Sequence, residues 1–288
     1  MKRFAFLIII LCVFVSMTGC DDDMFVGVFY SLGSPLKYDD SEATRRLKVA
    51  ACCLESSIDP DSSFSRMVGM ISGVKTDHPD VRLIVFGETV LGWYYKPDEP
   101  EAYQRRIAQT IPGPATDSVA ELCKTYDIYV VFGLAELRGG YLYNSQVLIN
   151  PQGSIQAVHS KHDLIYWDQL SGYTQGMDTT IVQIDDIKAG MIVCADINSL
   201  WATRSIGSQN VDVVIHSLAN VGDLNLEIDP NSRRFDAWEI FANRYGWEGA
   251  GEERYLYGGE TYIADPVGCV RERSRGEQGY VFCDLGVH

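Results

Sequence analysis

Short apolar runs that alternate with helical segments constrain the fold of this chain more than any other feature of its sequence. Early runs are separated by helical spacing, whereas late runs follow one another as hairpins. Because parallel strands need long crossovers and antiparallel strands need only turns, this order predicts a mixed α/β sheet system. The expected strands are residues 48–54, 81–86, 128–134, 143–149, 154–159, 180–184, 191–193, 211–216, 258–264, 269–273 and 280–284, and the expected helices are residues 63–74, 101–109, 115–126, 198–206 and 233–243.

The chain length fits one large domain behind an export signal. A chain of 288 residues can form one large α/β domain or two small ones, and residues 47–288 are expected to form one. Lys2 and Arg3 precede an apolar run that is too short for a typical membrane-spanning helix, so residues 1–20 are interpreted as a signal peptide. Residues 21–46 are expected to act as a tether.

The end of the signal peptide predicts a lipid anchor. Residues 17–20, Met-Thr-Gly-Cys, resemble a bacterial lipoprotein processing box, which makes Cys20 the lipidated first residue of the mature protein. The alternative is an ordinary signal peptide that ends in Cys, but the small residues before Cys20 favour lipidation. We therefore expect a lipid-anchored protein of the bacterial cell envelope, facing the periplasm or the surface.

Charge and motif content argue against several other classes of protein. The net charge of −15 disfavours binding to nucleic acid and to anionic lipid. There is no CxxC spacing for a metal and no glycine-rich phosphate loop, so no metal site is expected. Cys52, Cys123, Cys269 and Cys283 lie in or beside apolar runs and are expected in the core. A bridge between Cys52 and Cys53 is unlikely, because consecutive strand side chains point to opposite faces.

One further cysteine is a candidate nucleophile. Residues 190–196 predict a buried strand that delivers Cys194 to its C-terminal end, although free cysteines are commonly buried and inert. Glu88 and Lys161 also follow apolar strands, and strand ends converge on one site in α/β sheets. Taken singly, such a Glu is usually a solvated turn residue and such a Lys a surface charge. Together they suit acyl transfer from nitrogen.

Each of these residues has a role in that chemistry. Cys194 would attack an amide carbonyl to form a thioester, while Glu88 would accept the thiol proton, pass it to the leaving amine and then activate water. Lys161 and the backbone N–H of Ala195 would stabilise the oxyanion. The charge of Lys161 is also expected to keep Glu88 ionised and to favour thiolate over thiol at Cys194.

Five motifs in order resemble the nitrilase or carbon–nitrogen hydrolase superfamily. They are residues 86–93 around Glu88, residues 143–162 around Lys161, residues 190–196 around Cys194, and the late segments 243–246 and 258–268. The resemblance implies a single-domain, four-layer αββα sandwich, a Glu-Lys-Cys triad and no cofactor. It also implies dimerisation that stacks two sandwiches, hence a homodimer or a larger homo-oligomer.

Several positions depart from the pattern of that family. Ala195 stands where Tyr or Trp is usual, and Asp196 resembles the amidase and carbamoylase branches. The second Glu that often lies between the Lys and the Cys is missing, and Asp168 is the nearest substitute. Candidates for the substrate pocket are Trp93, Tyr94, Trp167, Trp201 and Asn220; plain core or interface packing is the alternative for the aromatic residues.

Three functions follow from these features. The first is an exported amidohydrolase that acts on a small linear amide or N-carbamoyl compound. The second is a Cys–His hydrolase that uses His159, His162 or His216, although no local motif matches it. The third is a catalytically weak or inactive lipoprotein that keeps the fold for binding or assembly, a reading motivated by the altered positions.

Overall fold

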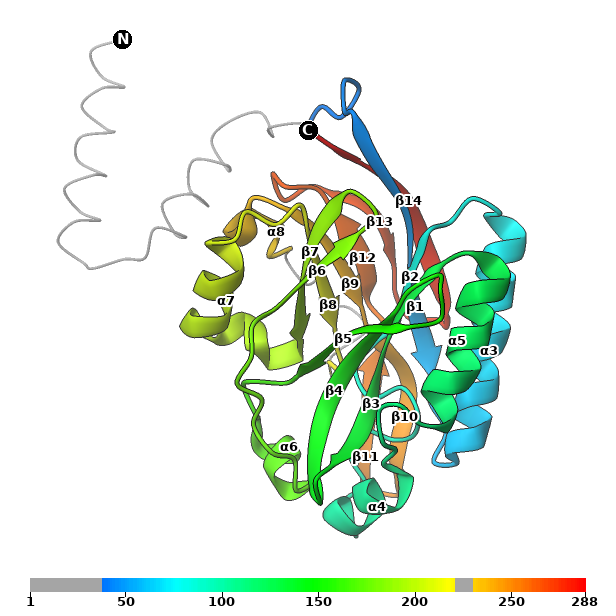
Figure 1. The fold of residues 1–288 in the computed structure, drawn as a ribbon. Coiled ribbons are helices and arrows are strands. Elements are labelled where there is room, and N and C mark those ends of the chain that lie inside the picture. Colours follow the sequence, from blue (N-terminus) through cyan, green and yellow to red (C-terminus); the bar gives the residue numbers. More distant parts are fainter. Residues whose placement is uncertain (1–37, 221–229) are drawn as a thin grey trace, which may run out of the picture. The chain divides into compact units, whose positions relative to one another are not determined.

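Two β-sheets lie face to face, and helices cover the outer face of each (Figure 1). The structure, a computed structural model, describes residues 38–220 and 230–288, with the side chains of residues 201 and 202 left out. Asp39–His288 form one compact unit. Helix, sheet, sheet and helix make four layers, so the predicted αββα sandwich is confirmed.

The larger sheet holds the first strand of the domain at its centre. Its strands in the described residues are β1 (Arg45–Glu55), β2 (Leu83–Val85), β3 (Tyr129–Arg138), β4 (Tyr141–Ile149), β5 (Ile155–Ser160), β10 (Arg244–Ala250), β11 (Glu253–Gly258) and β14 (Gly279–Val287). Their order is β11-β10-β1-β2-β3-β4-β5, and β14 also pairs with β1. Strands β1, β2 and β3 are parallel, so their carboxyl ends meet at one edge.

The smaller sheet carries the strand that leads to Cys194. Its strands in the described residues are β6 (Thr180–Ile184), β7 (Ile187–Val193), β8 (Val213–Ser217), β9 (Trp238–Ala242), β12 (Thr261–Ala264) and β13 (Val270–Ser274), in the order β13-β12-β9-β8-β7-β6. The central strands β7, β8 and β9 are parallel. Both faces of a parallel sheet are covered, which explains the continuous apolar runs there.

Helices pack on the outside of each sheet. In the described residues they are α3 (Pro60–Asp77), α4 (Pro100–Ile107), α5 (Pro114–Tyr126), α6 (Tyr166–Leu170), the 3₁₀ helix η1 (Cys194–Asn198), α7 (Leu200–Gly207) and α8 (Ser232–Phe235). Helices α3 and α5 bury apolar residues such as Met67 and Val119 against the larger sheet. On the smaller sheet, α7 and α8 bury Ile206 and Phe235. The N-cap of α3 is Asp59, whose carboxylate accepts a hydrogen bond from the Ser62 N–H at 3.1 Å.

Most of the predicted elements are present, but the helix expected at residues 233–243 is wrong. Helix α8 ends at Asp236, which has a left-handed backbone with φ of 50°, and β9 follows in parallel with β8. All five residues of β9 are buried. The strand expected at residues 258–264 is confirmed only for residues 261–264, which form β12, because Gly259, with φ of 71°, separates β12 from β11. Strand β10 was not predicted.

The cysteines in the described residues are all free. Cys52, Cys53 and Cys123 are buried, and the expectation that Cys52 and Cys53 do not bridge is confirmed. Cys269 and Cys283 are only half-buried, so their predicted place in the core is wrong; Cys269 directly precedes the edge strand β13, and Cys283 lies in β14. Cys194 is also free, as an essential thiol requires.

The predicted signal peptide, Cys20 and most of the tether fall in residues 1–37, outside the described residues. Strand β1 begins at Arg45, two residues before the predicted start of the domain. Across the described residues, no helix combines the length and the apolar character needed to span a membrane.

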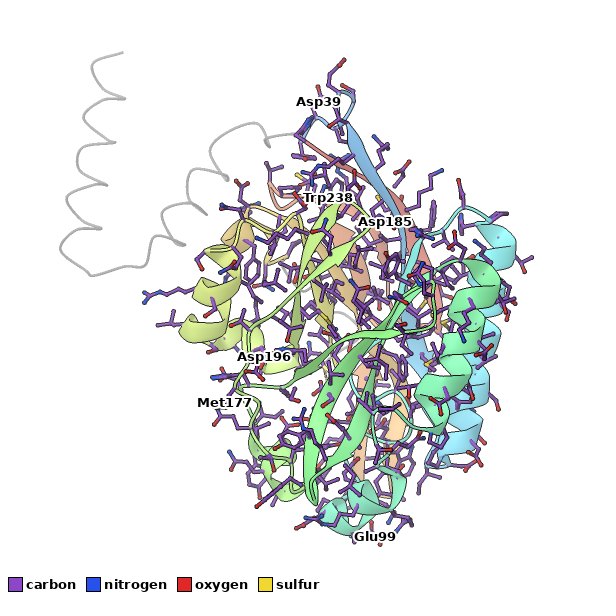
Figure 2. The ribbon with its side chains drawn as sticks, in the orientation of Figure 1. Asp39, Glu99, Met177, Asp185, Asp196 and Trp238 are labelled. Carbon is purple, nitrogen blue, oxygen red and sulfur yellow. The ribbon has the colours of Figure 1, made fainter. Side chains whose placement is uncertain are left out.

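Trp238 joins the two sheets. It lies in β9 of the smaller sheet with 1% of its surface exposed, and its indole Nε1–H donates to the Gly286 carbonyl in β14 of the larger sheet at 3.0 Å (Figure 2). Its side chain therefore contributes both apolar burial and a satisfied polar contact between the sheets.

Replacing Trp238 should destabilise the protein strongly. Trp238→Ala is expected to lower the free energy of unfolding by about 3–5 kcal/mol, because it leaves a cavity and removes a hydrogen bond between the sheets. The matched control is Trp247→Ala, since Trp247 is 49% exposed and its ring lies against the Arg254 guanidinium; its cost should be about 1 kcal/mol or less. Urea unfolding measures both values. Equal losses would contradict this role for Trp238.

Candidate active site

Three strand ends carry the predicted catalytic residues to one place. Glu88 follows β2, Lys161 is the residue after β5, and Cys194 is the residue after β7. The first two strands belong to the larger sheet and the third to the smaller sheet. The candidate site therefore lies where the two facing sheets end, which is a common location for ligand sites in α/β folds.

A fully buried lysine forms the centre of the site. Lys161 Nζ lies 2.8 Å from Glu88 Oε1 and 2.7 Å from Asp168 Oδ2, and all three side chains are 0% exposed. Burying a cation is costly unless it is paired, and here two carboxylates pair with it. Asp168 is fixed in turn by the Tyr94 hydroxyl at 2.8 Å and by the Ile165 N–H at 3.0 Å. The substitute acid named from the sequence thus lies in the same cluster.

The two oxygens of Glu88 have different surroundings. Oε1 accepts hydrogen bonds from Lys161 Nζ and from Asn144 Nδ2, the latter at 2.5 Å. Oε2 is buried and has no hydrogen-bond partner among the described residues. An unpaired buried carboxylate oxygen destabilises the fold. Such an oxygen is typical of a functional site, where a proton or a bound molecule interacts with it during the reaction.

Cys194 has a strained backbone. Its φ of 46° places it in the left-handed region, where a side chain costs about 1–3 kcal/mol. It ends β7 and begins η1, so the chain turns sharply at the thiol. The thiol interacts electrostatically with Glu88, Lys161 and Asp168, and the backbone N–H of Ala219 donates to it. All three residues of the predicted triad are therefore brought together with Asp168.

The thiol is protonated in this environment. Burial, reinforced by the negative charge of Glu88, raises the pKa of Cys194 to about 12 and outweighs the opposite effect of Lys161. The charge of Lys161 lowers the pKa of Cys194, as expected, but it is outweighed, so the thiol is the favoured form. Burial and the Asp168 charge also raise the pKa of Glu88 above its ordinary value, against the effect of Lys161. Burial opposes the charge of Lys161, but Glu88, Cys194 and Asp168 raise its pKa well above the ordinary value.

A buried ion pair holds the segment that carries Glu88. The guanidinium of Arg244 donates to the carbonyls of Glu88 at 3.0 Å and of Gly92 at 2.7 Å, and also to that of Thr89. It pairs with Glu248, which accepts from the Tyr94 N–H at 2.9 Å. Arg244 was noted within a late motif but had no predicted role, because the carbonyls that it holds are more than 150 positions away in the sequence.

Asp196 connects the segments that carry Lys161 and Cys194. Its Oδ1 accepts from the backbone N–H groups of His162 and Asp163, both at 2.8 Å. Its Oδ2 accepts from the Val193 N–H at 2.9 Å and lies 2.9 Å from His159 Nε2. Asp196 was expected only as a marker of a family branch. The structure shows that its carboxylate fixes both sides of the site.

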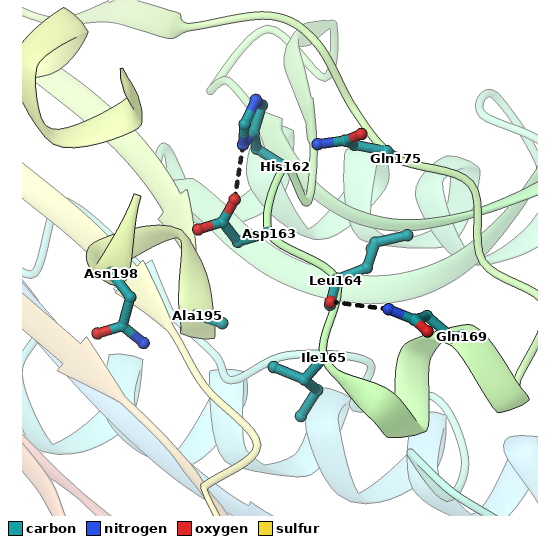
Figure 3. A pocket seen from close by; sticks show the side chains of 8 residues that line it. All are labelled: His162, Asp163, Leu164, Ile165, Gln169, Gln175, Ala195 and Asn198. Atoms are coloured by element: carbon teal, nitrogen blue, oxygen red, sulfur yellow. Dashed lines mark hydrogen bonds and ion pairs between the residues drawn. The ribbon is translucent and has the colours of Figure 1, made fainter. Parts of the chain in front are cut away.

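A cavity of about 450 Å³ opens beside Ala195 (Figure 3). Amide, carboxylate and imidazole side chains line it together with three apolar ones. The lining residues are His162, Asp163, Leu164, Ile165, Gln169, Gln175, Ala195 and Asn198. Such a mixture suits a small polar molecule. In the described residues, no group of His, Cys, Asp and Glu side chains has an arrangement that could hold a metal ion.

The five residues named for the pocket have different positions. Tyr94 lies in the Lys161 cluster, and Trp167 stacks on Tyr95 with ring centroids 5.7 Å apart. Trp93 lines a separate cavity of about 290 Å³. Asn220 is half-buried after β8, and its N–H donates to Asn243 Oδ1 at 2.9 Å. Trp201 lies in α7, but its side chain is outside the described part.

Known proteins are similar to this chain in sequence and in fold. A family model described as carbon-nitrogen hydrolase matches residues 48–285. An (R)-stereoselective amidase from Pseudomonas sp is 25% identical over 77% of this chain and 80% of its own length, and a nitrilase from Pyrococcus abyssi is 26% identical over 73% and 77%. A formamidase from Bacillus thuringiensis is 33% identical over 43% of this chain and 37% of its own length.

Solved structures show the same architecture. An amidase from Nesterenkonia sp. superposes with a TM-score of 0.72 at 15% identity, covering 88% of this chain and 93% of its own. A carbon-nitrogen hydrolase from Helicobacter pylori G27 superposes with a TM-score of 0.70 at 16% identity, covering 83% and 89%. These identities establish the fold alone, whereas the family model covers most of the sequence. The chain therefore belongs to the carbon–nitrogen hydrolase family and is a hydrolase of carbon–nitrogen bonds other than peptide bonds.

Proposed function

We propose that this protein hydrolyses a small linear amide or N-carbamoyl compound through a thioester on Cys194. The observation that carries the proposal is the asymmetry of Glu88. One carboxylate oxygen is saturated by Lys161 and Asn144, and the other is buried without a partner among the described residues. An oxygen of this kind beside a protonated thiol has the properties of a general base.

The first half of the reaction transfers the acyl group to sulfur. Glu88 Oε2 accepts the thiol proton as Cys194 Sγ forms a bond to the carbonyl carbon, and the carbonyl π electrons move to oxygen. Lys161 donates to Glu88 and Asp168, and its third donor makes only a long contact of 3.4 Å with the Tyr94 hydroxyl, which this oxyanion would replace. The Ala195 N–H is the second donor. When the C–N bond breaks, Glu88 protonates the leaving nitrogen.

The second half releases the acid. Glu88 accepts a proton from water as the water oxygen bonds to the thioester carbonyl, and the C–S bond then breaks as the thiol regains a proton from Glu88. Because burial raises the pKa of Cys194 to about 12, the reaction cannot start from a preformed thiolate, and Glu88 must remove the thiol proton. The reaction uses protein groups and water only, so it needs no cofactor.

The relatives support an amide substrate. The names of the Pseudomonas amidase and the Bacillus formamidase both describe amide hydrolysis. The contacts of the three candidate histidines do not favour the Cys–His alternative. His216 contacts the Cys194 carbonyl oxygen at 3.1 Å and Glu239 at 2.9 Å. His159 lies 2.9 Å from Asp196, and His162 lies 2.9 Å from Asp163. Ammonia release from a panel of short amides and carbamoyl amino acids would identify the substrate.

Substitutions in the triad should separate its roles. Cys194→Ala should abolish turnover, and Cys194→Ser should be nearly as damaging because a hydroxyl is far less acidic. Lys161→Ala should lower kcat on the order of 10²-fold or more, as loss of an oxyanion donor does. Glu88→Gln keeps the side-chain shape and removes the base, so it should bind substrate without releasing amine.

The matched control is Cys283→Ala, which removes another free, half-buried cysteine. It should leave kcat unchanged. Full turnover by folded Cys194→Ala would contradict the proposed mechanism and would favour a lipoprotein that uses the fold for binding.

The pH dependence of kcat/KM should follow Glu88. The base must be ionised, so activity is present above the pKa of Glu88 and is lost as pH falls through it. Because that pKa is raised above its ordinary 4.5, the acid limb should lie above pH 4.5. Ionisation of Cys194 should not increase the rate between about pH 7 and 10. An acid limb below 4.5 in protein that circular dichroism shows to be folded would contradict this assignment.

We further propose that Cys20 anchors the enzyme to a membrane of the bacterial cell envelope. The support is the Met-Thr-Gly-Cys box behind the apolar run. One acyl chain binds a membrane only weakly, so firm attachment implies several chains. Cys20→Ser should move the protein to the soluble fraction or leave it unprocessed, while Cys12→Ser, within the apolar run, should not. Unchanged membrane fractionation of Cys20→Ser would contradict lipidation.

A further inference from the structure

A buried histidine contacts the backbone of the proposed nucleophile. His216 in β8 is 1% exposed, and its Nε2 lies 3.1 Å from the carbonyl oxygen of Cys194. Its Nδ1 lies 2.9 Å from Oε1 of Glu239, which is fully buried in β9. His216 was one of the histidines that a Cys–His hydrolase could use as the base for the thiol. Its contact is instead with the peptide group that follows the thiol.

We propose that His216, held by Glu239, sets the plane of the Cys194–Ala195 peptide and thereby aims the Ala195 N–H at the oxyanion. The inference rests on the proposed function, because it assigns a positioning residue to that reaction. The residue acts through the backbone and touches no reacting atom.

The hydrogen-bond partners determine where the proton of His216 lies. A carbonyl oxygen can only accept, so Nε2 must carry a hydrogen and donate it to Cys194. Nδ1 then either donates to an ionised Glu239 or accepts from a protonated one, and Nε2 is a donor in both cases. The second oxygen of Glu239 accepts from the Asn231 N–H at 2.7 Å and the Tyr262 hydroxyl at 3.1 Å. Glu239 is therefore held in place, and it fixes the imidazole through Nδ1, the nitrogen that does not contact Cys194.

The geometry of a trans peptide carries this constraint to the oxyanion donor. The carbonyl of Cys194 and the N–H of Ala195 belong to one planar unit and point in opposite directions. Fixing the oxygen on His216 therefore fixes the direction of the N–H. That N–H lies in the first turn of η1, where donors have no acceptor within the helix. Ala195 also lines the cavity beside the site (Figure 3).

Two further properties give His216 an effect on catalysis. Cys194 has φ of 46°, a conformation that persists only where its surroundings hold it. A hydrogen bond to a peptide carbonyl also polarises the whole peptide, which makes its N–H a better donor. Loss of the imidazole would thus weaken both the direction and the strength of the oxyanion contact.

Three variants test the proposal. His216→Phe removes the donor and should lower kcat about 10²-fold with little change in KM, in line with loss of one oxyanion donor. His216→Gln places an amide N–H near the position of Nε2 and should restore most of that activity. Phe241→Leu is the matched control, since Phe241 packs against the imidazole with ring centroids 5.2 Å apart and is equally buried; it should leave kcat close to wild type.

Alkylation of Cys194 by iodoacetamide separates positioning from general damage. The sulfur displaces iodide from a CH₂ group, so no oxyanion forms, and mass spectrometry of the Cys194 peptide gives the rate. His216→Phe should alkylate at nearly the wild-type rate although turnover is lost. Parallel losses in both reactions, or an equal loss of turnover in Phe241→Leu, would overturn the proposal.

Two measurements keep the test independent of folding and of the proposed function. If His216→Phe fails to fold, Glu239→Gln, which keeps the side-chain shape, should still lower kcat while leaving alkylation unchanged; wild-type turnover would overturn the proposal. A crystal structure of His216→Phe should show a rotated Cys194–Ala195 peptide. A crystal structure of His216→Gln should show this peptide in its wild-type orientation. An unrotated peptide overturns the inference whatever the turnover, whereas turnover by Cys194→Ala overturns only the proposed function.

Discussion

The buried charge of Lys161 is the interaction on which the rest of the site depends. A cation with no exposed surface is stable only if carboxylates lie within contact distance, and Glu88 and Asp168 do so from two different segments. Burial of the thiol, reinforced by the negative charges of Glu88 and Asp168, raises the pKa of Cys194. In the proposed mechanism, the thiol proton must therefore move to Glu88 as sulfur attacks.

The backbone around this cluster is fixed by buried polar side chains that do not take part in the chemistry. Arg244 holds the carbonyls around Glu88, and Asp196 holds the N–H groups that follow Lys161 and the one that precedes Cys194. Each hydrogen bond to a charged group contributes about 1.5–3 kcal/mol. Such contacts can offset a left-handed cysteine and an unpaired carboxylate oxygen, both of which destabilise the free enzyme.

The sequence predicted the αββα fold and placed Glu88, Lys161 and Cys194 at strand ends, because apolar runs and the residues that follow them are local signals. It failed at residues 233–243, where apolar residues fit either a helix or a buried strand and only pairing with β8 decides. It could not reveal Arg244, Asn144 or Glu239 as parts of the site. Their roles depend on partners brought near by the fold, and the raised pKa of Cys194 depends on burial that no local pattern records.

The departures from the family pattern can now be read as changes in shape more than in charge. Asp168 is one methylene shorter than the glutamate it replaces, yet it reaches Lys161 because the Ile165 N–H and the Tyr94 hydroxyl hold it at the start of α6. The cation therefore keeps two carboxylates. At position 195 an aromatic ring would extend into the cavity that the methyl group of Ala195 only borders. The charges around Lys161 are preserved while space opens beside Cys194. In the proposed reaction, the side chain at position 195 would therefore affect which acyl or amine group fits, while the Ala195 N–H would remain available to the oxyanion.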